Sequence, residues 1–476
     1  MRTRIAVIGG GASAVSFCAL SAKRLNNCDI TVFEKNDDIG LGLAYAPKDP
    51  YFLLNVPAAK MGLFADNSSD FYHWLKSTAA QRGAWHEKLA HKSIEATDFA
   101  PRMLYGAYLQ DRFETAIKIA PERGNTLKVL QKEISKVSPI AHDTKHKLKL
   151  EAQTGYMDEF DVVLLATGNS LPKSLPIIHK AEAEAGVSQA YPNPYHAEFY
   201  NKAWGADDHI ICIGTGLSMV DAVHVLSEKN YQGRFTAISR RGLLPFAHLP
   251  KTAQYTVPSP FLEVDTMPEK LSELIRCIRE HLSQNQEGAA LPWQIMLDSL
   301  RPVANTLWHS LSAQDQKRMM RIMPWWNVAR HRIPDYVHKK LMDMQASGQL
   351  QIVKSHIETI QIQVAETGGI EKKPVKELIE VTLKNGGLIK GSAVVNCSGY
   401  SYNAAPLQKI CSDIPLSTHW SGSLQAASAQ SLKVSQEYPI YAIGPLLCGA
   451  EFESTAIHEI RSHAALLVSE LLEKQG

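Results

Sequence analysis

The sequence lacks the residue groups that several common chemistries require. Its seven cysteines are dispersed, with no Cys-x-x-Cys pair, and no cluster of residues has the spacing of metal ligands. This argues against a flavin disulfide reductase, whose chemistry needs two closely spaced cysteines, and no metal site is predicted. Dispersed thiols fit a reducing, cytoplasmic compartment. No run of about 18 apolar residues is present, so no transmembrane span is expected.

Net charge is also small. The chain has 50 basic and 48 acidic residues, and it therefore lacks the broad basic surface of a nucleic-acid-binding protein. A small anionic ligand could still be held by a few local arginines. We expect a globular protein that acts on a small molecule, with neither nucleic acid nor membrane as a partner.

Two stretches have the pattern of a dinucleotide-binding turn. RIAVIGGGASAVSF begins at Arg4, and IICIGTGLSMVDAV begins at Ile210. Each opens with an apolar run typical of a strand buried on both faces, followed by two glycines at the same offset. The first glycine lets the chain turn sharply, and the second lets backbone amides approach a pyrophosphate at the start of a helix. The residues expected to contact the cofactors at these turns are Gly9, Gly11, Ala12, Ser13 and Ala14, then Gly214, Thr215, Gly216, Leu217 and Ser218. The second copy departs from the strict pattern, with Met219 where the first has Ala14.

The end of the second strand predicts a different cofactor for each copy. DITVFEK ends in Glu34 and Lys35, and the Glu34 carboxylate can accept hydrogen bonds from ribose hydroxyls while repelling a 2′-phosphate. The corresponding strand of the second copy ends in Ser239, Arg240 and Arg241, which offer a hydroxyl and two guanidinium groups that suit a 2′-phosphate. We therefore expect FAD or NAD at the first turn and NADPH at the second. The alternative is two unrelated strand–turn–helix units with a solvated arginine pair.

The rest of the chain repeats the same plan. FDVVLLATGNS (160–170) and GSAVVNCSGYS (391–401) are apolar strands that end in a glycine turn, and each follows a strand-rich stretch. The predicted class is α/β, with two Rossmann-like dinucleotide-binding domains and a helical insertion. We expect residues 1–175 and 400–476 to form an FAD-binding domain, and 205–255 and 346–399 an NADPH-binding domain.

With these motifs the chain resembles the YdhS-like family of bacterial FAD/NAD(P)-binding proteins. Stretches that carry the resemblance include GLGLAYAPKDPYFLLNVPAAKMG, ISRRGLLPFAH, WWNVARHRIP and IGPLLCGAEFESTAIHEIR. More distantly, the order of parts is similar to that of N-hydroxylating flavin monooxygenases acting on ornithine, lysine or aspartate.

The resemblance implies further FAD contacts. Gly40 and Gly42 would pass close to the pyrophosphate, Arg102 and Tyr105 would help to hold the cofactor, and Thr167 and Gly168 would close the domain. The positions implied beside the isoalloxazine are Asn55, Val56, Pro57 and Met61. Those that would return the chain to the flavin are Gly444, Gly449, Glu451, Ser454, Thr455 and Ala456, with a helix expected from Ser454. Pro445 stands where disulfide-reductase relatives carry an Asp, so that residue's role is not transferred.

Helix-like spacing of apolar residues predicts that 256–345 is a helical insertion, which could cap the active site. Near its end, PWWNVARHRIP concentrates positive charge beside aromatic side chains. Trp326, Arg330, His331 and Arg332 are therefore candidate substrate-site residues, with an arginine as a carboxylate clamp. The alternative is a solvated basic loop or an internal ion pair.

Together these features predict a cytoplasmic flavoprotein, an FAD- and NADPH-dependent oxidoreductase. The leading hypothesis is a monooxygenase that uses O2 and a flavin C4a-hydroperoxide to hydroxylate a small substrate, with amino- and carboxylate-bearing compounds as first candidates. Such chemistry needs no amino-acid nucleophile and no metal. The alternative is an NADPH-dependent flavin reductase that passes electrons to a quinone or protein acceptor, and a third reading is a cofactor-bound sensor.

Overall fold

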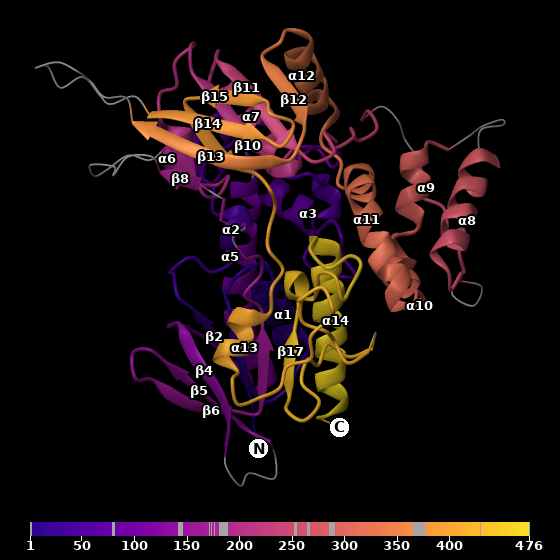
Figure 1. Ribbon diagram of the computed structural model, residues 1–476. Coiled ribbons are helices and arrows are strands. Elements are labelled where there is room, and N and C mark those ends of the chain that lie inside the picture. The colour runs from indigo at the N-terminus through magenta and orange to yellow at the C-terminus, as the bar shows by residue number, and fades with distance from the viewer. Residues whose placement is uncertain are drawn as a thin grey trace, which may run out of the picture.

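Short runs of branched apolar residues form the strands of two parallel five-stranded sheets in the computed structural model (Figure 1). The structure describes residues 2–78, 81–140, 146–170, 172, 174–175, 177–179, 189–251, 255–263, 267–284, 291–364, 377–428 and 430–475. The first sheet has the order β17 (Ile440–Ala442), β7 (Val162–Leu165), β1 (Thr3–Ile8), β2 (Cys28–Glu34) and β3 (Thr126–Gln131). The second has the order β9 (Ala190–Tyr191), β16 (Ala393–Asn396), β10 (His209–Ile213), β11 (Arg234–Ser239) and β12 (Leu350–Lys354).

The two sheets share the arrangement of four strands and differ in the fifth, because edge strand β17 follows the other strands of its sheet in the chain whereas edge strand β9 precedes them. In each, the strand before the glycine turn is central, with the next two strands of the chain on one side. In both, the chain forms antiparallel strands after the third strand of the parallel sheet. It then returns to the parallel sheet on the other side of the central strand. The internal duplication and the α/β, Rossmann-like class expected from the motifs are both confirmed.

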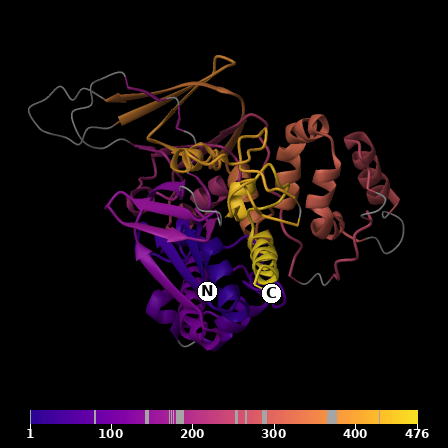
Figure 2. The same ribbon diagram turned by 90° about the horizontal axis from the view of Figure 1, so that it is seen from below.

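Two smaller sheets, one antiparallel and one mixed, project from the parallel ones (Figures 1 and 2). One contains β4 (Ile134–Pro139), β5 (Leu148–Ala152) and β6 (Met157–Phe160). The other is mixed because β8 (Ile177–His179) runs parallel to β13 (Ile357–Val364), and it also contains β14 (Glu377–Leu383) and β15 (Leu388–Gly391).

Long helices bury the faces of the parallel sheets. The core of the first sheet takes residues from α1 (Ala12–Arg24), α5 (Arg102–Ile119) and α14 (Ile457–Glu473). The core of the second takes residues from α7 (Leu217–Glu228) and α12 (Asp335–Ala346). Shorter helices are α2 (Gly42–Tyr45), α3 (Asp70–Ser77), α4 (Arg82–Trp85), α6 (Ala197–Asn201) and α13 (Ala405–Ile410), with 3-10 turns at Ala58–Lys60, Glu87–Leu89, Ala120–Arg123, Arg301–Val303 and Gly444–Leu447.

The segment between the second and third strands of the second sheet is helical. It contains α8 (Leu271–Gln284), α9 (Trp293–Ser299), α10 (Ala304–Ser310) and α11 (Ala313–Arg330), which have a hydrophobic cluster of their own. These four helices lie to one side of both sheets (Figures 1 and 2). In the described part of the chain, no helix is long and apolar enough to cross a membrane.

Two details differ from the expected domain ranges. Helix α12 packs in the core of the second sheet. The part of the insertion that packs apart from this sheet therefore ends before residue 345. Strand β9 joins the second sheet although it lies outside both ranges expected for that domain. Its two residues are too few to give a strand pattern. The exact division into domains stays a prediction.

Candidate functional site

The first glycine of each turn is required by a close backbone approach. Gly9 has φ +100°, and a Cβ there would lie 2.6 Å from the carbonyl oxygen of Ala166, at the end of β7. Gly214 has φ +114°, and its Cβ would lie 2.3 Å from the carbonyl oxygen of Cys397, after β16. Only glycine fits, since both the space and the left-handed backbone exclude a side chain.

The second glycine of each turn faces open space. A Cβ on Gly216 would meet no atom within 4 Å, and one on Gly11 would only reach the Cα of Gly42, at 4.0 Å. Gly11 and Gly216 are the N-caps of α1 and α7, and no side chain caps either helix among the described residues. The first-turn N–H groups are thus left for an anionic ligand, as a pyrophosphate-binding turn requires.

A second glycine loop lies over the first turn. The N–H of Gly40 donates to the carbonyl oxygen of Gly10 at 2.7 Å, which holds this loop against the turn. Gly42 has φ +50°, and a Cβ there would lie 3.8 Å from the Cα of Gly11. The backbones of Gly11 and Gly42 therefore approach each other closely, and together they border the open space in front of the turn.

Glu34 lies at the edge of this space. Its Oε2 accepts from the N–H of Gly10 at 2.7 Å, and its Oε1 accepts from the N–H of Asn36 at 3.1 Å. Each carboxylate oxygen keeps a further lone pair for a ribose hydroxyl. The neighbouring Lys35 is exposed.

The second copy has a hydroxyl network at the corresponding place. The Oγ1 of Thr215 donates to the carbonyl oxygen of Leu243 at 2.5 Å and lies 2.9 Å from the Oγ of Ser239. Because Thr215 has one hydroxyl hydrogen, the Ser239 hydroxyl must donate to Thr215, and it also accepts from the N–H of Gly242 at 2.9 Å. Ser239 is thereby left with one acceptor position, which suits a ribose hydroxyl and not a phosphate oxygen.

The two arginines after Ser239 differ in exposure. Arg240 is exposed. Arg241 lies with its guanidinium carbon 4.8 Å from the ring centroid of Trp325 and donates to the carbonyl oxygen of Arg321 at 2.9 Å. Helix α11 of the insertion therefore orients one of the two candidate phosphate-binding arginines, a contact that the sequence pattern did not reveal.

The loop that carries Asn55 lies between the two sheets. The carbonyl oxygen of Asn55 accepts from the Nε2 of His248 at 2.9 Å, and burial lowers the pKa of His248 to about 4. Val56 is half-buried, Pro57 precedes a 3-10 turn, and Met61 is buried in the first core. Arg461 of α14 donates to the carbonyl oxygen of Gly62 at 2.9 Å, which ties the end of this loop to the C-terminal helix.

Arg102 connects the two halves of the molecule. Its Nη2 lies 2.7 Å from the Oδ2 of Asp221 in α7, and its Nη1 donates to the Tyr195 hydroxyl at 3.1 Å. Burial opposes the charge, but Asp221 raises the pKa of Arg102 above its ordinary value. Tyr105, one turn later, is fully buried in the core of the first sheet. Arg102 thus holds α5 to α7, and this role was missed because nothing in the sequence links it to Asp221.

The C-terminal segment returns to the first turn. Gly444 has φ +71°, and a Cβ there would lie 2.8 Å from the Oγ of Ser13. On the neighbouring strand, Thr167 has its Cα 2.9 Å from a Cβ built on Gly9, and Gly168 has φ +71°. The expected helix begins at Ile457 with Ala456 as its N-cap, so Ser454 and Thr455 belong to the loop before it. Gly449, with φ +105°, packs against the side chain of Ser421.

The insertion binds this segment through ion pairs. The Nε of Arg330 lies 3.0 Å from Oε1 of Glu453. On either side, Arg301 pairs with Glu459 at 2.7 Å, and His309 pairs with Glu451 at 3.1 Å. Arg330, Glu453, Glu459 and Glu451 all have side chains no more than 10% exposed. The helical insertion is therefore held against the segment 451–459, as a cap would be.

The predicted basic cluster is paired internally. Burial opposes the charge on Arg330, but Glu453 and Asp298 raise its pKa. Arg332 binds both carboxylate oxygens of Asp298 at 2.6 Å. Burial, reinforced by Arg330, lowers the pKa of His331 to about 4, so this ring is neutral at pH 7. The cluster is thus an internal ion-pair network, one of the alternatives stated for this stretch. The other alternative, a solvated loop, does not hold from Pro324 to Arg330, because these residues belong to α11.

Comparison with known proteins finds that the stretch containing the first of these turns matches a described family. Residues 6–170 match the FAD-NAD(P)-binding family. The chain is 21% identical over 265 residues to the uncharacterized protein YdhS of Escherichia coli (strain K12), an alignment that covers 51% of this chain and 46% of that protein. The chain thus aligns with less than half the length of this relative. The resemblance predicted from the motifs is confirmed, as is the expected FAD/NAD(P)-binding character.

Solved structures share the whole architecture at low identity. The ornithine N-hydroxylase KtzI of Kutzneria sp. 744 has a TM-score of 0.61 at 11% identity, and the ornithine hydroxylase PvdA of Pseudomonas aeruginosa has 0.60 at 14%. The bacillithiol disulfide reductase Bdr of Staphylococcus aureus has 0.56 at 11%. In each comparison 100% of both chains is covered. These likenesses establish the fold, which N-hydroxylating and disulfide-reducing flavoproteins share.

Proposed function

We propose that the protein is an FAD-dependent monooxygenase that takes its reducing equivalents from NADPH. The observation that carries the proposal is the pair of uncapped helices behind Gly11 and Gly216, followed in one copy by Glu34 and in the other by Arg240 and Arg241. One fold hosting each cofactor explains why the chain contains two similar turns with different charges beside them.

FAD belongs at the first turn. The backbone around Gly11 and Gly42 leaves room for its pyrophosphate, and Glu34 repels a 2′-phosphate while accepting from ribose hydroxyls. When bound, this cofactor supplies hydride acceptance and oxygen activation, which no side chain of the protein can supply.

NADPH belongs at the second turn. Arg240 and Arg241 supply guanidinium donors for the 2′-phosphate, and Ser239 keeps one acceptor position for the ribose. The two folds are otherwise similar. Because Glu34 is negative and the two arginines are positive, FAD binds to the first fold and NADPH to the second.

The insertion favours oxygenation over simple electron transfer. Oxygen activation requires a site from which water is excluded, and the ion pairs of Arg301, Arg330 and His309 hold the insertion against the segment 451–459. The balanced reaction consumes substrate, NADPH, a proton and O2, and yields hydroxylated substrate, NADP+ and water. Arg330 and Arg332 hold the insertion and its partners together, so neither is assigned as a carboxylate clamp.

The test follows NADPH loss, O2 uptake and hydroxylated product together in the FAD-loaded protein. Ornithine, lysine, cadaverine and neutral apolar compounds form the substrate panel. We expect slow NADPH oxidation alone and faster oxidation with one substrate group, with one product per O2 consumed. Rapid reduction of a quinone under argon, with no oxygenated product in air, would instead identify an NADPH-dependent reductase.

A further inference from the structure

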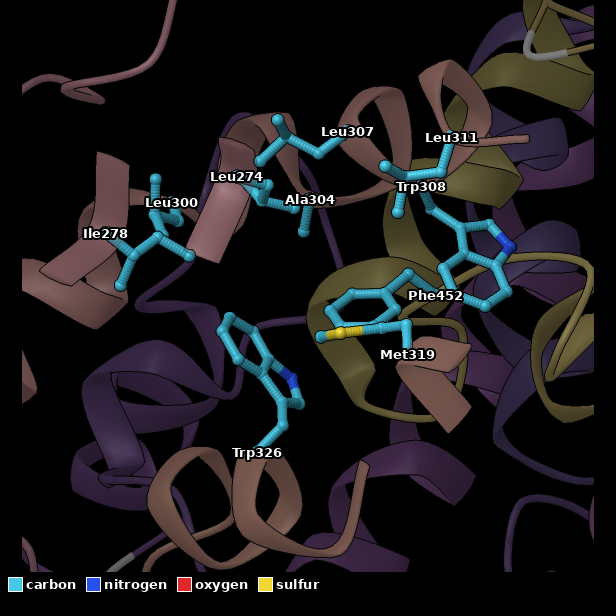
Figure 3. A pocket seen from close by; sticks show the side chains of 10 residues that line it. All are labelled: Leu274, Ile278, Leu300, Ala304, Leu307, Trp308, Leu311, Met319, Trp326 and Phe452. Atoms are coloured by element: carbon cyan, nitrogen blue, oxygen red, sulfur yellow. The ribbon is translucent and has the colours of Figure 1, made fainter. Parts of the chain in front are cut away.

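The helical insertion contains an apolar pocket that the cofactor sites do not use (Figure 3). It spans about 380 Å³ of space that includes open solvent, so only part of that volume is enclosed by the protein. Residues of α8, α10 and α11 and of the turns after α9 and α10 line it, together with Phe452 from the C-terminal segment: Leu274, Ile278, Leu300, Ala304, Leu307, Trp308, Leu311, Met319 and Trp326. No lining residue carries a formal charge.

Aromatic side chains form one wall of the pocket. The ring of Phe452 lies 5.4 Å from Trp308 and 5.1 Å from Trp326, measured between centroids. Met319 lies beside these rings (Figure 3). Such a wall offers dispersion contacts to a ring or a short chain, and burial of apolar surface contributes roughly 25 cal/mol per Å².

Two indole donors in the wall have no hydrogen-bond partner among the described residues, the buried Nε1 of Trp308 and the buried Nε1 of Trp326. In Trp308 that nitrogen lies on the far side of the ring from Met319 (Figure 3), so the candidate donor to a ligand is the Nε1 of Trp326. Figure 3 shows this nitrogen on the side of the ring that faces Met319 and Phe452. A buried N–H without an acceptor costs free energy, and an oxygen on a ligand would relieve that cost.

The surroundings exclude a charged ligand. The nearest ionic groups on the segment 451–459 are already paired, with Glu451 to His309 and Glu453 to Arg330. An ion in the pocket would be desolvated without a counter-charge, which is unfavourable. The ligand is therefore neutral.

We propose that this pocket binds the substrate, and that the substrate is a neutral apolar compound carrying one acceptor oxygen. The assignment of the bound compound as substrate rests on the proposed function, because Phe452 belongs to the segment expected to return to the flavin. Phe452 is the one lining residue contributed from outside the insertion, so it joins the pocket to that segment.

Binding is tested with the full-length protein and the neutral fluorophore N-phenyl-1-naphthylamine, whose emission rises when it leaves water. We expect saturable binding of one probe per chain, and displacement by 1-phenylhexan-1-one. Ala304→Phe fills the pocket and should weaken probe binding at least tenfold. Ala313→Phe makes the same change at an exposed position of the insertion and should leave probe binding unaltered. Absence of saturable binding, or equal effects of the two variants, would overturn the proposal.

A second variant tests the hydrogen bond and does not depend on how Ala304→Phe folds. Trp326→Phe keeps a ring but removes the N–H. It should weaken displacement by 1-phenylhexan-1-one by about tenfold, the effect of one buried hydrogen bond, and leave displacement by hexylbenzene unchanged. Equal effects on both compounds would overturn the assigned role of Trp326.

The substrate assignment is tested separately from binding. The ketone should accelerate NADPH oxidation by the FAD-loaded wild type and not by Ala304→Phe. Saturable ketone binding without acceleration would overturn the substrate assignment. Failure of the protein to bind FAD or oxidise NADPH would instead refute the proposed function, because probe binding requires neither cofactor.

Discussion

Two glycines of the same turn have different functions at the residue scale. Gly9 has a positive φ and faces a carbonyl oxygen, whereas Gly11 has φ −75° and faces open space. The first is needed for folding, and the second is assigned to the ligand under the proposed function. The sequence motif alone cannot distinguish the two requirements, because glycine stands at both positions.

Alanine at each position distinguishes them. Gly9→Ala should destabilise the apoprotein by about 2–4 kcal/mol, since it adds both backbone strain and overpacking. Gly11→Ala should change apoprotein stability by less than about 1 kcal/mol, because its backbone suits alanine, yet should weaken FAD binding at least tenfold. Urea unfolding and FAD titration measure the two effects. Equal loss of stability in both variants would refute this distinction.

The positions of the candidate cofactor residues in the fold were predictable where the sequence pattern is local. Glu34 and the Ser239–Arg241 run follow strands that the apolar pattern identifies, and the structure puts them at the ends of β2 and β11. Pairing partners far along the chain were not predictable. Asp298 pairs with Arg332, which is 34 residues away in the chain, and Glu453 pairs with Arg330, which is 123 residues away. No local sequence pattern predicts such pairs.

At the scale of elements, α11 contacts both candidate cofactor regions. Its Trp325 covers Arg241 beside the second turn, and its Arg330 binds Glu453 on the segment returning to the first. The periodicity of the sequence predicted a helical insertion, but it could not show which side chains would reach the two sheets.

Under the proposed function, the contact with Arg241 makes Trp325 a positioning residue for NADPH. Trp325 is 50% exposed, so its cation–π interaction contributes about 0.5–1 kcal/mol. Trp325→Leu should raise the KM for NADPH two- to fivefold without changing kcat, and Trp325→Phe should restore most of the affinity. Steady-state kinetics with NADH provide the control, whose KM should not change. A fall in kcat alone would show that the contact does not position Arg241.

The docking of the insertion should depend on pH through His309. Its hydrogen bond to Glu451 raises the pKa of His309 above the ordinary value of 6.5 against the effect of burial. A raised pKa in the folded state means that the stabilisation is complete below about pH 6.5 and is lost as the pH rises through the folded-state pKa. His309→Gln should therefore lower the denaturation temperature most at pH 6, with the difference from wild type vanishing at alkaline pH. A difference that grows with pH would contradict this assignment.

At the scale of the whole molecule, the chain is a duplicated fold held together by buried polar contacts. Matched glycine turns were enough to predict the duplication, because strand, turn and helix follow one another within about 20 residues. The relation between the two halves was not predictable, since it depends on contacts such as Arg102 with Asp221 across 119 residues.

That contact can be tested by a double-mutant cycle. Arg102→Met or Asp221→Leu alone should destabilise the protein by about 3–5 kcal/mol, because each leaves a buried charge without its partner. The double variant should recover most of that loss, since two apolar side chains replace the ion pair. Thermal and urea unfolding provide the measurement, and simple additivity of the single effects would rule out a direct coupling.

The central claim, that FAD occupies the first fold and NADPH the second, is tested most directly by anaerobic rapid mixing. Purified protein should carry the visible absorbance of oxidised flavin, and NADPH should bleach it. In Arg240→Ala/Arg241→Ala, the half-saturating NADPH concentration should rise at least tenfold while that of NADH stays unchanged. A protein that remains colourless after reconstitution with FAD, or a variant that responds equally to both coenzymes, would contradict the account.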